Sequence, residues 1–240
     1  MAEAAGKTAK GEQTRALILE TALELFRERG YEETTMRAIA ERAGVALGSA
    51  YYYFRSKEQL IQAFYGRTHQ EHLTDAEAVL RTERTLRDRL LGVMQAKLRT
   101  IEPYHRFSGI LFRTAADPES PLNPFSEESL PARREATELF GEVVRGAEDR
   151  RKLPKDLEAE LPELLWTYHM GIVLFWIHDR SPGRVRTWRL MERTVDLVAR
   201  LIGLSALPLM GPIRKMVLKL LAELRQPAPE ETEEPAVVNG

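Results

Sequence analysis

Three adjacent tyrosines, Tyr51, Tyr52 and Tyr53, are the side chains in this sequence best suited to polar chemistry at a surface. Burying all three would be costly, because each phenolic hydroxyl needs a hydrogen-bond partner once it leaves water. On a surface, a tyrosine hydroxyl can bond a phosphate oxygen and its ring can pack on a thymine methyl. Gly48 permits close backbone approach to a groove, and Lys57 adds positive charge. The group predicts a DNA-contacting surface; the alternative is a half-buried aromatic cluster.

Two short helical patterns joined by a glycine turn position these tyrosines. Thr34 and Thr35 supply the N-cap of the first helix, and Gly44 supplies the left-handed conformation that ends it. The apolar residues of this helix recur at three-and-four spacing, namely Met36, Ile39, Ala40 and Ala43. Residues 47–54 then form a helix of about two turns, short enough to enter a major groove end-on. Its outward face carries Leu47, Gly48, Ser49 and the three tyrosines.

This segment resembles the N-terminal DNA-binding domain of the TetR family of transcriptional regulators. The resemblance runs from Arg15 to about Ala63, centred on GYEETTMRAIAERAGVALGSAYYYFRSKEQLI. It implies that Gly30 and Tyr31 end the first helix of the domain. It also implies a set of base-facing residues, Leu47, Gly48, Ser49 and Tyr51. The backbone of DNA would be held by Thr34 or Thr35 at the helix cap and by Tyr52, Tyr53 and Lys57.

Two features of the segment depart from the commonest pattern of the family. Members often have a hydroxyl residue at the position of Ala46 and Lys, Arg or Pro at that of Leu47, so a polar contact is expected to be missing. Ala50 stands where a larger aliphatic residue is usual. The helix over residues 47–54, which would be the recognition helix, therefore buries a smaller side chain in the core. Neither departure breaks the motif, but both weaken any inference about the operator sequence.

The charge of the chain allows DNA binding through a few well-placed cations. The net charge is −1, and residues 1–57 hold nine Lys and Arg against eight Glu. Arg37 on the second helix, with Arg55 and Lys57 after the third, are the basic groups expected nearest the phosphates. We therefore expect a modest salt dependence of binding. The absence of cysteine and of a long apolar segment predicts a cytoplasmic protein without disulfides or membrane contact.

The remaining chain continues as helical patterns, which predicts an all-α fold. A helix capped by Ser56 is expected to run to about Arg81 and to link two domains mechanically. We expect a flexible arm over residues 1–12 and a helix-turn-helix DNA-binding domain over residues 13–57. A larger helical ligand-binding and dimerisation domain then covers residues 58–225. Residues 226–240, which hold four Glu and no Lys or Arg, are expected to form a disordered acidic tail.

Two strongly apolar helical patterns, over residues 157–179 and 184–204, follow one another near the end of the larger domain. Around residues 172–177 the apolar positions cover more than one side, which indicates burial on several sides. The family resemblance implies that these helices pair with their two-fold mates in a homodimer. The interface candidates are Leu164, Tyr168, Ile172, Trp176, Trp188, Met191, Val195, Val198 and Ile202. The alternative is an ordinary helix hairpin within one domain.

A pocket between the central helices is expected to bind a small molecule. Its candidate lining is aromatic with a few polar anchors: Met94, Tyr104, His105, Phe107, Phe112, Arg113, Trp166, His169 and Phe175. Such a lining favours a flat or lipophilic ligand, and a buried Arg113 would favour an acid. His69 and His72 lie three residues apart, but a polar helix face explains them better than a metal. We find no catalytic or cofactor motif with useful spacing, so no enzyme, cofactor or metal is expected.

These features favour a homodimeric regulator that binds a palindromic operator in double-stranded DNA, because one short helix reads too few bases to be selective. A small effector would favour a subunit geometry that no longer fits the DNA. Two alternatives stay open. One is an architectural or partner-controlled DNA-binding factor without a ligand, which a filled second domain would favour. The other is an enzyme with an unrecognised helical site, which turnover of a pocket ligand would reveal.

Overall fold

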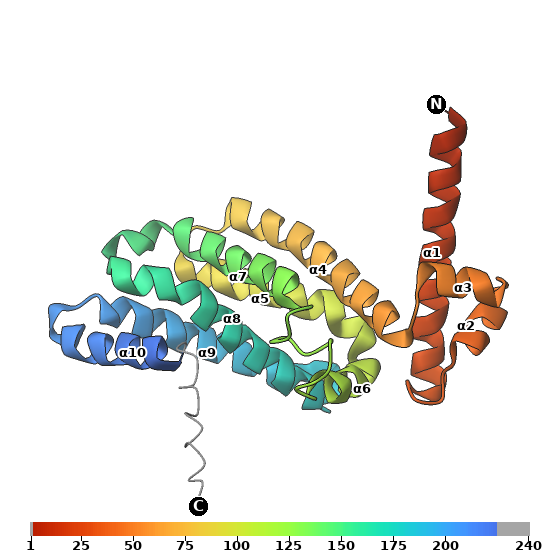
Figure 1. Cartoon of the computed structure of the whole chain (residues 1–240). Helices are drawn as coiled ribbons and strands as arrows, with labels where there is room; N and C mark the ends of the chain where they lie inside the picture. Colours follow the sequence, from red (N-terminus) through yellow and green to blue (C-terminus); the bar gives the residue numbers. More distant parts are fainter. Residues whose placement is uncertain (1, 225–240) are drawn as a thin grey trace, which may run out of the picture.

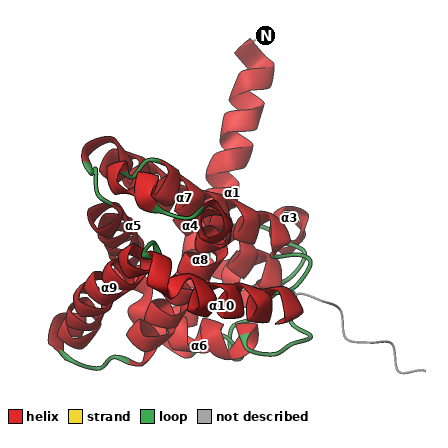
Figure 2. Ribbon diagram, turned by 90° about the vertical axis from the view of Figure 1, so that its left-hand side faces the viewer, coloured by secondary structure: helices red, strands yellow, loops and turns green. Residues whose placement is uncertain are grey.

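The computed structural model describes residues 2–224, which form helices and loops but no strands (Figures 1 and 2). The predicted all-α fold is confirmed. The reader domain comprises α1 (Ala2–Arg29), α2 (Met36–Arg42) and α3 (Leu47–Tyr53). The larger domain comprises α4 (Lys57–Thr82), α5 (Leu86–Ile101), α6 (His105–Ala115), α7 (Leu130–Arg145), α8 (Lys155–His178), α9 (Val185–Ser205) and α10 (Gly211–Leu224). The acidic tail expected over residues 226–240 lies outside the described residues.

Helix α1 begins at Ala2, within the segment expected to be a flexible arm. Residues 2–12 are rich in Ala, Glu and Lys, which are good helix formers, so the helix continues through two glycines. Figures 1 and 2 show this first part of α1 standing away from the other helices. The helix ends before Gly30, whose φ of 89° is a conformation that glycine adopts without steric cost.

The hydrophobic core of the reader continues into the larger domain. Phe26 of α1 stacks on Phe107 of α6, with ring centroids 5.4 Å apart. Phe64 of α4 packs edge-on against Phe107 at 6.2 Å, and Leu60 and Ile61 are fully buried in the same cluster. The core therefore crosses the boundary expected after residue 57 and joins α1, α4 and α6 in one packed unit.

A second hydrophobic core fills the larger domain between α4, α5, α7, α8 and α9. Buried Arg89 of α5 fixes its far end. The Arg89 guanidinium donates to the carbonyls of Leu80 and Glu83 at 2.8 and 2.9 Å. It also donates to those of Glu142 and Val143 at 2.9 and 3.0 Å. One side chain thus bonds carbonyls near the C-terminal ends of α4 and α7, where helix geometry leaves carbonyls without intrahelical partners. The Glu142 carbonyl also accepts from the Gly146 amide, at 3.0 Å.

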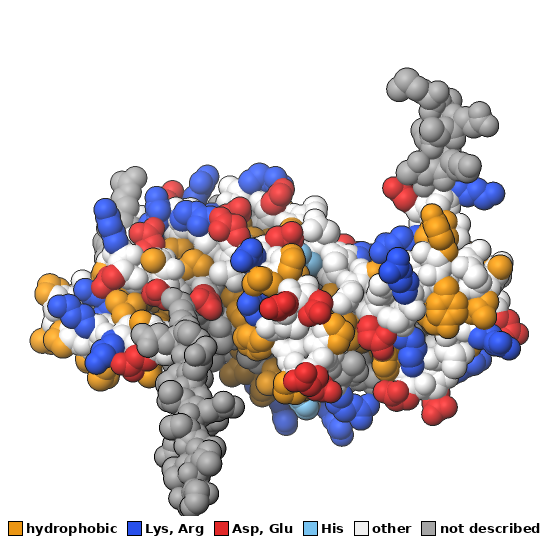
Figure 3. Space-filling model, in the orientation of Figure 1, with side chains coloured by type: hydrophobic (Ala, Val, Ile, Leu, Met, Phe, Trp, Pro, Cys, Tyr) orange, Lys and Arg blue, Asp and Glu red, His pale blue; other side chains and the backbone are white. Residues whose placement is uncertain are grey.

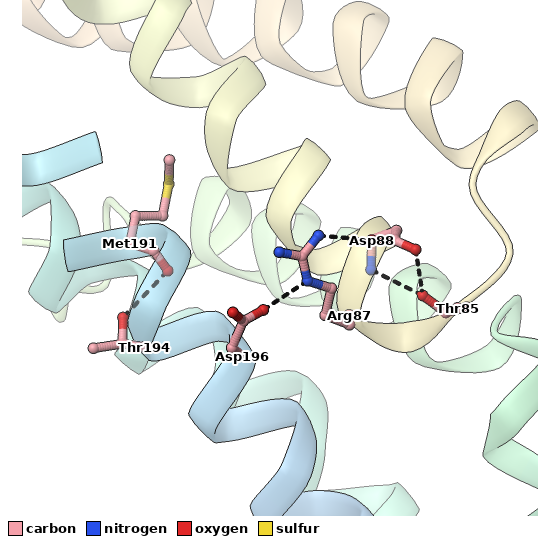
Figure 4. A network of polar contacts seen from close by, with 6 residues as sticks. All are labelled: Thr85, Arg87, Asp88, Met191, Thr194 and Asp196. Carbon is pink, nitrogen blue, oxygen red and sulfur yellow. Dashed lines mark hydrogen bonds and ion pairs between the residues drawn. The ribbon is translucent and has the colours of Figure 1, made fainter. Parts of the chain in front are cut away.

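An ion-pair network holds α9 against α5 (Figure 4). Arg87 Nε lies 2.8 Å from Asp196 Oδ1 of α9, and Arg87 Nη1 lies 2.8 Å from Asp88 Oδ1. Asp88 is itself tied to the start of α5, where the Thr85 hydroxyl accepts a hydrogen bond from the Asp88 amide at 3.1 Å. The same polar network therefore caps the start of α5 and holds α9 against α5.

The turn between α8 and α9 is organised around buried Asp179. Its Oδ1 accepts from the amide and hydroxyl of Ser181 at 2.9 and 2.7 Å. Its Oδ2 accepts from the amide and hydroxyl of Thr187 at 2.9 and 2.7 Å. Burial alone would raise the pKa of Asp179, but these hydrogen bonds outweigh burial and hold the pKa well below its usual value. The carboxylate fixes the hairpin of the two helices.

Helix α10 turns back after the short η4 helix (Pro208–Met210) and packs against α8. Arg214 Nε lies 3.2 Å from Asp156 Oδ2 at the start of α8. Within residues 2–224, no single helix is long and apolar enough to cross a membrane. The segments Pro182–Ser205 and Pro208–Glu223 meet that length and composition only together, across a 94° bend.

Candidate nucleic-acid interface and ligand cavity

The helix-turn-helix is fixed by a cap, a glycine and a small buried residue. The Thr35 hydroxyl oxygen accepts a hydrogen bond from the Ala38 amide at 3.2 Å and caps α2. Gly44 has a φ of 66°, and the Val45 amide donates to the Ala40 carbonyl at 3.0 Å across the turn. Ala50 of α3 is completely buried. The small side chain at this position lets α3 pack closely against the hydrophobic core of the reader domain. The opposite face of α3 points outward.

The outward face of α3 presents two tyrosines to solvent. Tyr52 is 82% exposed and Tyr51 is 47% exposed. Tyr53 is half-buried and packs edge-on against Tyr52, with centroids 5.1 Å apart. Gly48 is exposed, whereas two other predicted base-facing residues, Leu47 and Ser49, are half-buried. The predicted base-facing and phosphate-binding tyrosines therefore lie together at one surface.

Thr34 does not lie at this surface, so its predicted phosphate contact is wrong. Only 1% of Thr34 is exposed, and its hydroxyl donates to the Gly30 carbonyl at 2.7 Å. The residue closes the connection after α1. Its neighbour Thr35 is exposed, and its hydroxyl hydrogen is free to donate to a phosphate oxygen. Arg37, the second residue of α2, is also exposed.

Lys57 has a structural role in addition to its predicted phosphate contact. Its Nζ donates to the carbonyls of Tyr31 and Glu32 at 2.7 and 3.4 Å and lies 4.2 Å from the Tyr31 ring centroid. The Tyr31 hydroxyl donates to Glu58 Oε1 at 2.7 Å. Burial raises the pKa of Tyr31, and this hydrogen bond to Glu58 raises it further. The ammonium keeps one N–H for a phosphate oxygen while it holds the start of α4 against the end of α1.

A cavity of about 260 Å³ lies between α4, α5, α6, α7 and α8. Four of the predicted pocket residues line it, namely Tyr104, Phe112, Trp166 and His169. Trp176, which was predicted at the dimer interface, also lines it, and its indole N–H donates to Glu102 Oε2 at 2.9 Å. The cavity therefore brings together aromatic residues from three separate helical segments.

The other five pocket candidates lie elsewhere. Met94 and Phe107 are buried in the two cores. His105 Nε2 hydrogen-bonds the Trp176 carbonyl at 2.8 Å, behind the cavity wall. Arg113 is exposed, because α6 turns that side toward solvent, and so supplies no buried cation. Phe175 is 41% exposed, because it projects from the side of α8 opposite the core.

Sequence reasoning missed the two cations that line the cavity, Lys97 of α5 and Arg133 of α7. Burial lowers the pKa of Lys97 to about 8. Lys97 stands three residues after Met94 and four before Ile101, so helical periodicity places it on the apolar face. That interruption of an apolar stripe was the available signal. Among the described residues, no cluster of three His, Cys, Asp or Glu could hold a metal.

Two family models match this architecture. The model for bacterial regulatory proteins of the tetR family matches residues 18–64, which contain α2 and α3. The model for the tetracyclin repressor-like C-terminal domain matches residues 89–218, more than half of the chain. The chain belongs to the TetR family. It is accordingly a DNA-binding transcriptional regulator rather than an enzyme.

Individual relatives agree with this assignment. The chain is 28% identical over 225 residues to the HTH-type transcriptional regulator TtgR of Pseudomonas putida, covering 86% of this chain and 97% of TtgR. It is 32% identical over 96 residues to the repressor KstR2 of Mycolicibacterium smegmatis, covering 37% of this chain and 43% of KstR2. A putative TetR-family regulator from Syntrophomonas wolfei has the same fold, with a TM-score of 0.64 at 16% identity and coverage of 78% and 95%.

TetR-family regulators function as dimers, but most predicted interface residues of this chain face its own core. Five of them are buried there, namely Ile172, Trp176, Met191, Val195 and Ile202. Tyr168, Trp188 and Val198 are half-buried against the same core, and Leu164 is half-buried as well. The five buried residues belong to the helix hairpin weighed as the alternative, and the four half-buried residues remain interface candidates. The most apolar faces of α8 and α9 pack into the core of their own chain.

The exposed apolar surface of this TetR-family chain lies on the other faces of α8 and α9 and on α10. Leu174 and Phe175 of α8 are 40% and 41% exposed, and Leu197 and Leu201 of α9 are each 55% exposed. Figure 3 shows hydrophobic side chains gathered with Lys and Arg at the end of the molecule where α9 and α10 lie. Several large exposed apolar side chains on neighbouring helices are typical of an interaction surface.

Proposed function

We propose that this TetR-family chain represses transcription as a homodimer on a palindromic operator, and that a small lipophilic or aromatic molecule in the cavity releases it. The observation that carries the proposal is that the cavity and the hydrophobic core around α1 share part of their lining, which we call the shared wall. Four residues belong both to the cavity lining and to the core that packs against the reader, namely Phe64, Leu111, Ala115 and Leu122. A ligand that moves these side chains therefore changes the packing against α1.

The recognition helix α3 supplies sequence selectivity. Its exposed end points Gly48 and Tyr51 at base edges, with Leu47 and Ser49 beside them, while Tyr52 and Tyr53 bond the phosphates. Three residues outside α3 complete the phosphate contacts, namely Thr35, Arg37 and Lys57. A helix of seven residues reads few bases, so two copies on successive major grooves are needed for selectivity.

The dimer forms through the outward faces of α8 and α9. Leu174, Phe175, Leu197 and Leu201 give each copy an apolar strip that a second copy can bury. Because these exposed residues lie on the two helices whose inner faces form the packed hairpin, the interface extends the domain core. Replacing Leu197 and Leu201 by Glu should yield monomers in sedimentation velocity, with operator binding weakened and folding preserved.

A polar bridge runs beside the shared wall. Arg67 of α4 pairs with Glu20 of α1, and its Nη2 donates to the Tyr104 hydroxyl at 3.1 Å. Tyr104 lines the cavity. A ligand that displaces Tyr104 therefore acts on α1 through Arg67 as well as through the apolar core. Release follows from the difference in ligand affinity between the DNA-bound geometry and the freed one.

The alternative of an architectural factor without a ligand is less well supported. A filled second domain would favour it, whereas this domain contains a cavity of about 260 Å³. The cavity volume is slightly below the range for small-molecule sites, about 300 to 1,000 Å³, which restricts the ligand to a small molecule.

Selection of bound fragments from a random DNA pool by the purified protein tests the proposed regulator. We expect enrichment of a palindrome, bound by two copies, with a modest salt slope. Compounds that bind the cavity should then weaken binding to that palindrome. Sequence-blind binding, or a palindrome that no cavity ligand releases, would contradict the proposal and favour the architectural alternative.

A further inference from the structure

The cavity wall is mostly apolar, with scattered hydroxyl groups and Arg133, and it carries one group of basic side chains from α4, α5 and α8. The apolar part includes Phe64, Leu111, Phe112, Val173 and Trp176. The polar part consists of Lys97 from α5, His69 from α4 and His169 from α8, with His72 behind them. A cavity with one polar end and one apolar end fits an amphipathic molecule.

Lys97 is the unusual member of this polar end. Among the side chains that the structure describes, none forms a hydrogen bond or ion pair with its ammonium group. Glu71 acts on it only from a distance, since the Glu71 carboxylate lies 3.8 Å from Arg67 Nε instead. A cation against an apolar wall without a partner is costly, because it loses hydration and gains no compensating contact. An anion in the cavity would remove that cost.

The three imidazoles divide into two that are engaged and one that is free. His69 Nε2 lies 3.1 Å from Glu135 Oε2, and His72 Nε2 donates to the Val93 carbonyl at 3.0 Å. His169 is only 4% exposed, yet its Nδ1 has no hydrogen-bond partner. Burial, followed by the charges of neighbouring groups, lowers the pKa of His169 well below its usual value. A neutral imidazole protonated on Nδ1 can donate to an acceptor in the cavity.

We infer that the cavity selects amphipathic monoanions, whose carboxylate binds Lys97 Nζ and His169 Nδ1 and whose hydrocarbon or aromatic body packs against the apolar wall. This inference rests on the proposed effector site and names its ligand class. The site offers one cation and one neutral donor, which match a single negative charge. The cavity of about 260 Å³ has room for several water-sized groups, so a medium-length chain and a small ring system are suitable probes.

Arg133 is the other cation that lines the cavity, but its guanidinium is already engaged. Its Nη1 donates to the Pro124 carbonyl at 3.3 Å, and its Cζ lies 5.8 Å from the Phe125 ring centroid. Phe125 in turn packs edge-on against Trp166 at 5.7 Å. Arg133 therefore holds the loop before α7 in place, and the structure assigns the anion to Lys97.

Calorimetric titration of the full-length protein at neutral pH tests this assignment with decanoate and its neutral isostere decanamide, and with naphthoate and naphthamide. We expect each carboxylate to bind at least about tenfold more tightly than its amide. Lys97→Met should weaken carboxylate binding about tenfold and leave amide binding unchanged. Arg133→Met should keep the wild-type preference. Lys155→Met, the same exchange at an exposed position outside the cavity, is the matched control.

Three results would overturn the inference: no carboxylate binding, equal affinity for acid and amide, or a preference that survives Lys97→Met. Thermal denaturation checks the fold of each variant, and Lys97→Gln replaces Lys97→Met if the latter unfolds. Operator release separates this inference from the proposed function. If amides bind and release operator as well as acids do, only the anion preference fails. If carboxylates bind through Lys97 without releasing operator, only the proposed control of DNA binding fails.

Discussion

Two cations of α5, Arg89 and Lys97, are eight residues apart and are treated in opposite ways. Arg89 is buried at the far end of the domain and donates to four backbone carbonyls. Lys97 lines the cavity and has no partner among the described side chains. Both lose hydration on folding, but only Arg89 is compensated within the chain. The difference separates a cation that serves the fold from one left for another molecule.

The same distinction applies to other polar groups. Asp179 accepts four hydrogen bonds inside the α8–α9 turn, whereas Tyr51 and Tyr52 of α3 present their hydroxyls to solvent. Substitution of a compensated group should cost stability and leave binding intact. Substitution of an uncompensated group should do the reverse. Four experiments test this division.

The largest effect is expected for Arg89→Met. Removal of the guanidinium leaves buried carbonyls of α4 and α7 without a donor and should lower the free energy of unfolding by about 4 kcal/mol. Urea denaturation measures the change. Arg99→Met on the exposed side of α5 is the matched control and should cost little. Lys97→Met should leave stability unchanged or raise it, and a comparable loss in both variants would erase the contrast between the two cations.

A smaller effect, on DNA affinity, is expected for the double substitution Tyr51→Ala and Tyr52→Ala. Loss of base and phosphate contacts in both copies of a dimer should weaken operator binding about a hundredfold. Because both side chains are exposed, the melting temperature should not change. Electrophoretic titration on the selected palindrome measures the affinity. Phe125→Ala removes an exposed aromatic residue outside the reader and should have no effect; unaltered specific binding by the double variant would show that the reader is misassigned.

Asp179→Asn should destabilise the protein by about 2 kcal/mol, since charge-assisted hydrogen bonds to Ser181 and Thr187 are weakened. The folded pKa of Asp179 lies below the unfolded value of about 3.9. The carboxylate therefore stabilises the protein fully above about pH 4, and this contribution is lost as pH falls further. Denaturation at neutral and acid pH should show the difference between wild type and variant shrinking in acid. Asp75→Asn, on the exposed side of α4, is the control.

The smallest effect is the pH dependence of decanoate affinity. The charged form of Lys97 predominates below its pKa of about 8, so affinity should be constant there and fall above it by about tenfold in total, the loss expected for Lys97→Met. The groups that face Lys97 are Glu71, His69 and His72 of α4 and His169 of α8. The pKa of His72 is lowered to about 3, and those of the other two imidazoles are also lowered, chiefly by burial. Calorimetry across pH 6 to 10 should show no such fall for decanamide or for Lys97→Met.

The reader could be predicted closely because its signals are local. The cap at Thr35, the turn at Gly44 and the tyrosines of α3 all lie within one short segment, and each is where the sequence placed it. The exception is Thr34, which is adjacent to an exposed hydroxyl residue of the same type. Which of two neighbouring threonines caps the helix depends on the backbone at the end of α1, which spacing does not reveal.

The cavity and the apolar surface were harder to predict, because they depend on how distant helices pack. Helices α8 and α9 carry apolar residues on more than one face, and only tertiary structure decides that Ile172 points inward and Phe175 outward. Arg113 and Lys97 could each have been the buried cation. Arg113 is exposed and Lys97 is half-buried in the cavity wall, and this difference follows from the orientation of α6 and α5.

The stack of Phe26 on Phe107 has a practical consequence for the design of hybrid regulators. A graft that joins this reader to another sensor after residue 57 would separate Phe26 from α6 and uncover aromatic surface on both halves. Such a hybrid should aggregate unless its new sensor supplies a matching ring. A functional hybrid must therefore keep α6 together with the reader domain, or redesign the residues of the new sensor that contact Phe26.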